Sequence, residues 1–226
     1  MTAKAVLVVG ASRGIGLEFV RQYRADGAPV IATHRAPADG ERLRALGAEA
    51  MRLDVLDATE IAALPQRLSG APLGLVIVNA GVFGPRTQGV VAPDGADFDA
   101  VMRTNVLAAM RLIPVLAPSL AAARGTLAVL SSRMGSTTLM QSASAWLYRA
   151  SKAALNSVMK SASIELGAQG IVCVALHPGW VRTDMGGAAA QLDIADSVAG
   201  MRRVLATADA SMHGGFFDFD GERLPW

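Results

Sequence analysis

Short, wholly apolar runs alternate along the chain with longer stretches of helical composition. Runs of this length, rich in Val, Leu and Ile, are typical of strands buried on both faces of a parallel sheet. The pattern predicts strands at 5–9, 29–33, 51–55, 73–78, 126–130, 171–176 and 215–219. It predicts helices at about 17–25, 58–68, 97–123, 145–168 and 190–207. Pro114 and Pro118 should bend or break the third helix, because proline cannot donate the helical hydrogen bond.

This alternation, without a repeat or a linker, predicts one α/β domain over residues 1–226. Its fold should be a single doubly wound parallel sheet of the Rossmann type, with helices on both faces. The chain is 52% hydrophobic but only 5% aromatic, so its core must consist mainly of small aliphatic side chains.

Charge and cysteine content narrow the class of protein. The net charge is only +2 and no Lys/Arg block occurs, so neither a nucleic acid nor a membrane surface is expected as a partner. Cys173 is the single cysteine and lies in an apolar run, where a buried side chain is expected rather than a reactive thiol. These features are typical of a cytoplasmic protein.

A glycine-rich segment follows the first predicted strand. Gly10, Gly14 and Gly16 have the spacing G-x-x-x-G-x-G and lead into the helix at 17–25. Glycines let the backbone approach a phosphate, and a helix N-terminus offers free N–H groups. Glycines also form ordinary turns, and the commoner fingerprint is G-x-G-x-x-G. The position between strand and helix favours nucleotide binding.

The residues after the second predicted strand bear on the choice of coenzyme. In dinucleotide sites an acidic residue there binds the ribose hydroxyls and favours NAD. This chain has His34 and Arg35, and Asp39 fits a helix cap better. Arg35 and Arg13 could bind a 2′-phosphate, or both could be solvated surface arginines. We expect NADP(H) to be favoured, with NAD(H) possible.

Tyr148 and Lys152 stand four residues apart in the helix at 145–168, so they share one face. A phenol has a pKa of about 10, and a nearby ammonium group favours the phenolate. The pair could therefore exchange a proton with a substrate. On most helices the same pair is a surface neighbour pair, so support must come from elsewhere in the chain.

That support comes from the strand ends. Ligands bind beyond the carboxyl ends of parallel strands, where the strand order reverses. The glycine segment, Asn79, Ser132 and residues 178–183 all follow predicted strands and should meet in one crevice. Asn105, inside a predicted helix, must either face solvent or have a specific role.

These segments together resemble the short-chain dehydrogenase/reductase family over essentially all 226 residues. The motifs are Gly10-x-x-x-Gly14-x-Gly16, Asn79-Ala80-Gly81, Asn105, Ser132, Tyr148-x-x-x-Lys152 and Pro178-Gly179 with Thr183. Each is weak alone, but six in order are specific. Residues 131–136, 148–156 and the ending 215–226 resemble the C-factor-like branch, which includes carbonyl reductases and a protein tied to developmental signalling.

The resemblance implies an oxidoreductase that transfers a hydride between nicotinamide and a small carbonyl or alcohol substrate. Tyr148 would be the acid/base, and Lys152 would hold the nicotinamide ribose and lower the pKa of Tyr148. Ser132 would donate a hydrogen bond to the substrate oxygen, and Asn105 would anchor a water in a proton relay. Ser132 precedes Tyr148 by sixteen residues, whereas thirteen is a common family interval, so Ser131 and Ser136 remain in contention.

The resemblance also implies which residues contact the coenzyme. Besides Tyr148 and Lys152, they are Gly10, Ser12, Arg13, Gly14, Ile15, Gly16, Arg35, Asp54, Val55, Asn79, Ala80, Gly81, Pro178, Gly179, Val181 and Thr183. No metal ligands are expected.

The substrate wall should be apolar and partly flexible. Its candidates, each of which could instead be ordinary core packing, are Phe83, Met134, Met140, Trp146, Trp180 and Met185. Residues 186–192 occupy the place of a substrate lid in relatives and are short and small, so an open pocket for aromatic or medium aliphatic aldehydes and ketones is expected.

The helices at 97–123 and 145–168 commonly form an interface in relatives, so a homodimer or homotetramer is expected. Two other functions stay open: a cofactor-binding signalling protein with little catalysis, and an interaction module that keeps only the fold.

Overall fold

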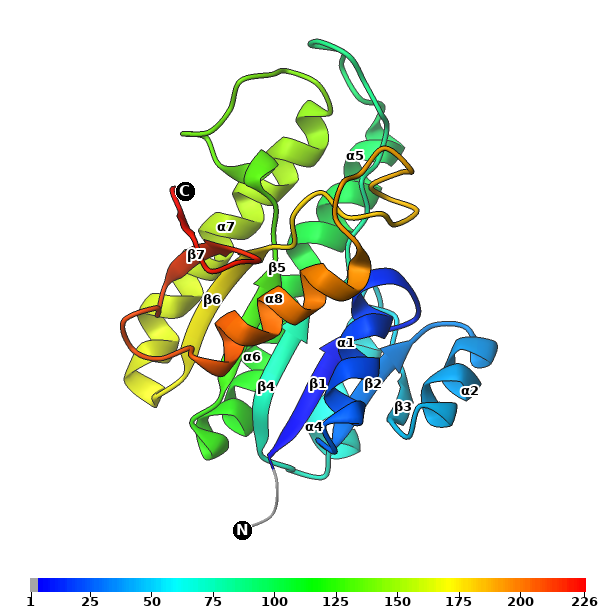
Figure 1. Cartoon of the computed structure of the whole chain (residues 1–226), viewed down its shortest axis with the longest axis vertical. Helices are drawn as coiled ribbons and strands as arrows, with labels where there is room; N and C mark the ends of the chain where they lie inside the picture. The colour runs from blue at the N-terminus through cyan, green and yellow to red at the C-terminus, as the bar shows by residue number, and fades with distance from the viewer. Residues whose placement is uncertain (1–3) are drawn as a thin grey trace.

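One mostly parallel sheet forms the centre of the computed structural model, which describes residues 4–226 (Figure 1). Its order is β3-β2-β1-β4-β5-β6-β7-β8, and within the described residues only the β7–β8 pair is antiparallel. The strands are β1 (Ala5–Val9), β2 (Val30–His34), β3 (Glu49–Arg52), β4 (Leu73–Val78), β5 (Thr126–Leu130), β6 (Val172–His177), β7 (Gly215–Asp218) and β8 (Arg223–Leu224). The predicted doubly wound parallel sheet is confirmed.

Strand order reverses beside β1, which pairs with β2 on one side and with β4 on the other. Val8, for example, is in register with Ala32 of β2 and Ile77 of β4. Because every pair from β3 to β7 is parallel, the carboxyl ends of these strands lie along one edge of the sheet. A ligand site is expected at that edge, at the point of reversal.

Helices cover both faces of the sheet, with α1 and α8 in front and α6 and α7 behind in Figure 1. The helices are α1 (Gly14–Ala25), α2 (Pro37–Ala45), α3 (Ala58–Ala62), α4 (Leu64–Arg67), α5 (Gly95–Met102), α6 (Ala108–Ala123), α7 (Trp146–Leu166) and α8 (Ile194–Ala206). Single turns of other types are η1 (Arg103–Leu107), η2 (Arg133–Gly135) and η3 (Gly167–Gln169).

The core has two layers because successive strand residues point to opposite faces. On β1, Leu7 and Val9 pack toward the α6 and α7 side, whereas Val6 and Val8 pack toward the α1 and α8 side. Cys173 is buried in the first layer, as predicted. A strand that is apolar at every position therefore contributes side chains to both layers of the core.

The long helix predicted at 97–123 is interrupted, but not at its prolines. A π-helical turn, η1 at Arg103–Leu107, separates α5 from α6, and α6 continues through Pro114 and Pro118. Both prolines are exposed, so the carbonyl groups that they leave unpaired lie on the solvated side of the helix, while Leu116 is buried on the other. The predicted break at the prolines is therefore wrong.

Three smaller expectations also need correction. The helix predicted at 58–68 is two short helices, α3 and α4, because Pro65 cannot continue the first. Asp39 is not the cap of α2 but lies in its first turn, after Ala36 at the N-cap. Strand β8 was not predicted, since two residues are too few to give a pattern.

The segment Gly95–Ala123 is long and apolar enough to cross a membrane by length and composition, with a mean hydropathy of 1.8. Half of its most apolar window is buried inside the structure, where α6 packs on β4 and α7. Its apolar face is thus used as a core helix in this fold.

The exposed prolines of α6 give a test of this arrangement. We expect Pro118→Ala to raise the free energy of unfolding by about 1–3 kcal/mol, because alanine restores an N–H donor and relieves the clash with the preceding turn. In the same helix, Leu116→Ala should lower it by about 2–5 kcal/mol by leaving a cavity. Denaturant unfolding monitored by circular dichroism measures both, and a loss of stability in Pro118→Ala would contradict the account.

Candidate active site

The glycine segment forms the turn between β1 and α1. Gly10 and Gly14 have positive φ angles of +85° and +52°, which glycine adopts without strain. A Cβ on Gly16 would lie 2.6 Å from the Asn79 side-chain nitrogen, so the turn packs too closely for any larger residue. Arg13 is the N-cap of α1 but makes no capping hydrogen bond, and the first turn carries no acid. The helix start is thus suited to an anionic group.

Asn79, at the end of β4, holds this turn in place. Its Nδ2 donates a hydrogen bond of 2.6 Å to the main-chain oxygen of Gly10. From the other side, Thr33 Oγ1 of β2 accepts a 2.9 Å bond from the Gly10 N–H. Side chains from the two strands beside β1 therefore fix the glycine turn.

A cavity of about 750 Å³ extends along the carboxyl edge of the sheet. The predicted residues that line it are Gly10, Ser12, Arg13, Gly14, Ile15, Arg35, Asp54, Val55, Asn79, Ala80, Gly81, Tyr148, Lys152, Pro178, Thr183 and Met185. Gly16, Gly179 and Val181 do not line it, nor do Asn105 and Ser132, whereas Ser131 does. Val181 instead forms a β-bridge with Leu192, which closes the segment between them into a loop. The expected convergence of distant segments is thus present in the fold.

Guanidinium groups gather at the end of the cavity formed by β2 and the glycine turn. Arg13 and Arg35 both line it, and Arg13 forms an ion pair with Asp184 from the loop after β6. Arg42 of α2 donates a 3.1 Å hydrogen bond to the main-chain oxygen of Ser12. Arg42 was not predicted, because it is separated from the strand end by a turn of helix and no sequence pattern marks it. This end of the cavity suits a phosphate better than an uncharged ribose.

Tyr148 and Lys152 are not surface neighbours. Tyr148 is 7% exposed and Lys152 is 5% exposed, and both side chains reach the cavity from α7. The Lys152 Nζ donates a 2.8 Å hydrogen bond to the main-chain oxygen of Leu130 at the end of β5. It lies 5.7 Å from the centre of the Tyr148 ring. The surface alternative is therefore excluded for this pair.

Burial controls the protonation of both groups. It raises the pKa of Tyr148 to about 12, and the hydrogen bond with Ser132 offsets only part of this rise. Burial also lowers the pKa of Lys152 to about 8. Loss of hydration is the largest cause of the shift in Tyr148, so the net pKa of the phenol lies above its ordinary value in the free protein. At neutral pH Tyr148 keeps its proton, as a proton donor requires.

The hydrogen bonds distinguish the three candidate serines. Ser131 Oγ donates to Asn156 Oδ1 of α7, and Ser136 Oγ donates to the main-chain oxygen of Trp226 at 3.1 Å. Ser132, the N-cap of η2, accepts a 3.1 Å bond from the Met134 N–H, and its hydroxyl is the one close enough to Tyr148 to lower the pKa of the phenol. The strand-end position of Ser132 thus places it beside the phenol despite the longer interval in sequence.

Asn105 lies in the π-helical turn η1, a type of distortion that is frequent at functional sites. Its Oδ1 accepts a 2.8 Å bond from the Val82 N–H, and its Nδ2 donates to Val82 O and to Ser151 Oγ, each at 2.9 Å. Ser151 Oγ in turn donates to the main-chain oxygen of Tyr148 at 2.8 Å. The Asn105 side chain therefore ties the segment after β4 to the first turns of α7.

An aromatic stack lies beside the phenol. The Phe83 ring stacks on the Tyr148 ring with 4.5 Å between centroids, and the Arg86 guanidinium lies 4.6 Å above Phe83. Arg86 also donates to the main-chain oxygen of Met185 across the cleft. Phe83 was predicted as substrate wall, but its contact with Tyr148 joins two distant segments and no sequence pattern could reveal it.

Of the predicted wall residues Met185 lines the cavity, whereas Phe83, Met134, Met140, Trp146 and Trp180 do not. Met140 and Trp180 are 43% and 54% exposed, so the alternative of core packing is wrong for both. The Trp146 Nε1 donates to Val91 O at 2.7 Å, and the Trp180 Nε1 donates to Gly186 O at 2.9 Å. Met134 is half-buried in η2, beside Ser132. Their role as a substrate wall stays a prediction.

Known proteins resemble this chain in sequence and in fold. A relative, C-signal of Myxococcus xanthus, is 41% identical over 156 residues, which cover 69% of this chain and 93% of that protein. An NADPH-bound carbonyl reductase from chicken fatty liver is 32% identical with a TM-score of 0.90, over 99% of this chain and 94% of that one. A carbonyl reductase from Pseudomonas aeruginosa PAO1, solved in complex with NADP, is 35% identical with a TM-score of 0.87 over the whole of both chains.

A family model described as short chain dehydrogenase matches residues 4–193, which includes the glycine turn, Ser132 and the Tyr148–Lys152 pair. The chain therefore belongs to the short-chain dehydrogenase/reductase family.

Proposed function

We propose that this protein is an NADP(H)-dependent oxidoreductase that transfers a hydride between nicotinamide and a small carbonyl or alcohol substrate. The observation that carries the proposal is the buried Tyr148–Lys152 pair of α7, which lines a cavity that also reaches the glycine turn, with Ser132 close enough to the phenol to lower its pKa. Residues 1–226 would act as one dinucleotide-binding unit. The relatives named as NADP- or NADPH-bound carbonyl reductases support the same activity.

The residues around the phenol would perform the proton chemistry. The nicotinamide, when bound, supplies the hydride, which no side chain can do. As negative charge develops on the substrate oxygen, Ser132 donates a hydrogen bond and Tyr148 donates the proton from its neutral phenol. Lys152 keeps a positive charge close to the phenolate that remains, which limits the cost of forming an anion in a buried site.

The rest of the cavity would hold the coenzyme. The start of α1 would hold the pyrophosphate, because its N–H groups have no capping side chain. Arg13, Arg35 and Arg42 would form the positive end for a 2′-phosphate, for which Arg13 would have to leave its ion pair with Asp184. Asp54 and Val55 would contact adenine, Lys152 would bind the nicotinamide ribose, and Thr183 would meet the carboxamide. Since the Asn105 side chain is engaged, a relay water would bind its main-chain oxygen in η1.

Aldehydes and ketones with an aromatic or medium aliphatic group are the proposed substrates. Phe83, Met140 and Trp180 offer apolar contact at the mouth, and the small residues at 186–192 leave it open. Initial rates of NADPH oxidation with a panel of carbonyl compounds test this class, and hydrophilic aldoses serve as negative controls.

A homodimer or homotetramer is proposed through the outer faces of α6 and α7. Met110 of α6 and Ile164 of α7 expose 54% and 75% of their surface. Light scattering after size-exclusion chromatography measures the mass, and a monomer at all concentrations would rule the assembly out.

The similarity to C-signal favours one second candidate, a coenzyme-binding signalling protein with little catalysis. Tight NADPH binding without turnover of any carbonyl in the panel would select this candidate over the enzyme.

Tyr148→Phe tests the proton donor. We expect turnover to fall by about 10²–10⁴-fold, because the variant loses the acidic proton. Coenzyme binding should stay close to wild type, since the stack with Phe83 is retained. Tyr23→Phe, which removes a hydroxyl from a ring stacked on Phe19 outside the cavity, is the matched control. Steady-state kinetics and fluorescence titration with NADPH measure the two effects, and normal turnover of Tyr148→Phe would refute the assignment.

Arg35→Ala tests the coenzyme preference. We expect KM for NADPH to rise about tenfold, which corresponds to one charge-assisted hydrogen bond to phosphate, with KM for NADH unchanged. Arg44→Ala removes the same charge from the exposed surface of α2, outside the cavity, and should change neither constant. An equal effect of Arg35→Ala on both coenzymes would show that Arg35 does not meet the 2′-phosphate.

The pH dependence tests the charge of Lys152. The Tyr148 pKa of about 12 keeps the phenol protonated through neutral pH, whereas Lys152, with a pKa of about 8, loses its charge above that pH. The rate of carbonyl reduction should therefore be level at neutral pH and fall as pH rises through about 8. Stopped-flow single turnovers at constant ionic strength measure it; a rate that rises through this range would contradict the assignment.

A further inference from the structure

The segment that carries Ser132 is held from two sides. On the α7 side, η2 packs so closely that a Cβ on Gly135 would lie 2.7 Å from the main-chain carbon of Lys152. Asn156 of α7 also donates a 3.3 Å hydrogen bond to the main-chain oxygen of Gly135. This contact explains how Ser132 keeps its place relative to α7, but it does not hold the other side of the segment.

The last residue of the sequence, Trp226, holds that other side. Its main-chain oxygen accepts hydrogen bonds from Ser136 Oγ at 3.1 Å, Thr138 Oγ1 at 3.0 Å and the Thr138 N–H at 3.4 Å. Its ring stacks on Phe216 of β7, with 5.5 Å between centroids, and Phe216 is fully buried. In Figure 1 the C-terminal end lies beside α7 and β7, close to the green segment that follows β5.

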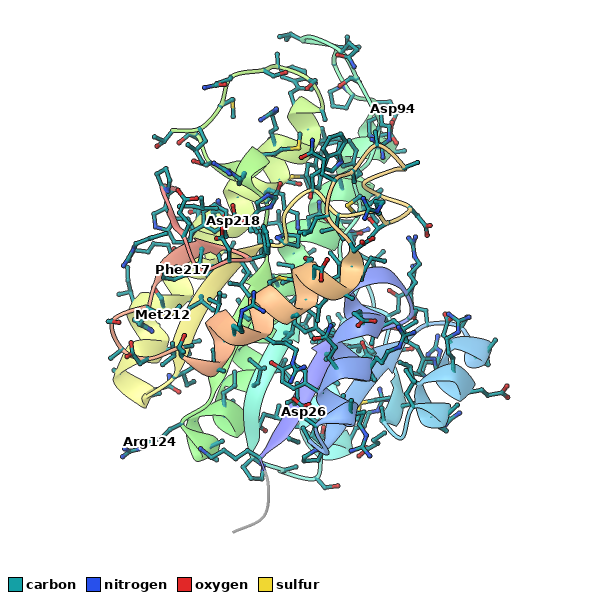
Figure 2. The ribbon with its side chains drawn as sticks, in the orientation of Figure 1. Asp26, Asp94, Arg124, Met212, Phe217 and Asp218 are labelled. Atoms are coloured by element: carbon teal, nitrogen blue, oxygen red, sulfur yellow. The ribbon has the colours of Figure 1, made fainter. Side chains whose placement is uncertain are left out.

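A second bond joins the same two parts of the fold. Arg133, the residue after Ser132, pairs with Asp218 at the end of β7 at 3.4 Å. Asp218 is labelled in Figure 2, where it lies at the end of the strand that leads into the final turn and tail. The segment of Ser132 is thus bonded to β7 and the tail at both ends of η2.

We propose that Trp226 is a positioning residue for the reaction: it anchors Ser136, and through the single turn η2 it fixes the hydroxyl of Ser132 relative to Tyr148. The inference rests on the proposed function, since positioning matters for turnover only if Ser132 and Tyr148 act on a substrate. It also gives a role to a sequence feature that the coenzyme site does not use, the long interval from Ser132 to Tyr148.

The physical reason is that Ser136 is fully buried and has few partners. Its hydroxyl donates to Trp226 and accepts from the Leu139 N–H at 3.2 Å. If the ring of Trp226 leaves Phe216, the accepting oxygen moves with it, and the Ser136 donor must move or lose its bond. Ser136 stands four residues from Ser132, across one 3-10 turn, so such a movement reaches the proposed donor directly. Displacements below 1 Å at a reacting centre are costly.

Trp226→Ala and Trp226→Phe test the proposal on the full-length chain. Trp226→Ala should lower kcat for carbonyl reduction by about 10–100-fold. It should leave the NADPH Kd unchanged, because Trp226 does not line the coenzyme cavity. Trp226→Phe keeps a ring that can stack on Phe216 and should restore most of kcat. Leu64→Ala, which removes a buried side chain in α4 far from the segment, is the matched control for lost stability and should not change kcat at a temperature where it is folded.

Amide hydrogen exchange of residues 133–139, measured without coenzyme or substrate, separates the two proposals. Exchange in this segment should rise in Trp226→Ala but not in Leu64→Ala. Unchanged exchange, or an unchanged kcat in an active enzyme, would overturn the role of Trp226. If exchange rises in Trp226→Ala but the wild-type protein reduces no carbonyl compound, the proposed function is refuted, while the anchoring role of Trp226 stands. If Trp226→Ala does not fold, Thr138→Val is the second test, because it removes one side-chain hydrogen bond to Trp226 at an exposed position. Exchange of residues 133–139 must then rise in Thr138→Val, or the proposal fails.

Discussion

The parallel pairing of seven strands is the constraint on which the rest of this structure depends. Parallel strands must be joined by crossovers, so helices cover both faces and every strand from β1 to β7 ends at the same edge. The strand order reverses beside β1, and the glycine turn begins where the two directions diverge. Side chains far apart in sequence are thereby brought to one cavity.

Buried hydrogen bonds convert this arrangement into a defined site. Asn79 joins β4 to the glycine turn, Lys152 joins α7 to β5, and Asn105 joins the segment after β4 to α7. Each of these polar groups would be costly to bury without partners, so the network restrains the relative positions of the elements that it links. The side chains with proposed chemical roles are also those that connect the elements, which couples catalysis to the integrity of the fold.

Burial also sets the protonation states of Tyr148 and Lys152. A phenol removed from water holds its proton more firmly, and an ammonium group removed from water releases its proton more readily. In the free protein the pair is therefore poised with a neutral Tyr148, which suits donation of a proton to a carbonyl oxygen.

The sequence by itself determined the buried strands of the parallel sheet and most of the helices, though not α2 or β8, because these follow from local patterns, whereas most of the coenzyme-contact residues came from the family resemblance. Apolar runs specify buried strands, and the glycine turn and the Tyr148–Lys152 spacing depend on neighbours within a few residues. It did not determine that α6 passes unbroken through its prolines, since that depends on which side of the helix faces solvent. Nor could it choose among Ser131, Ser132 and Ser136, which differ only in partners from α7 and the tail. Only the tertiary structure decided the pKa of Tyr148, the Phe83 stack and the contact of Trp226, because burial and contacts between distant segments arise when the layers pack.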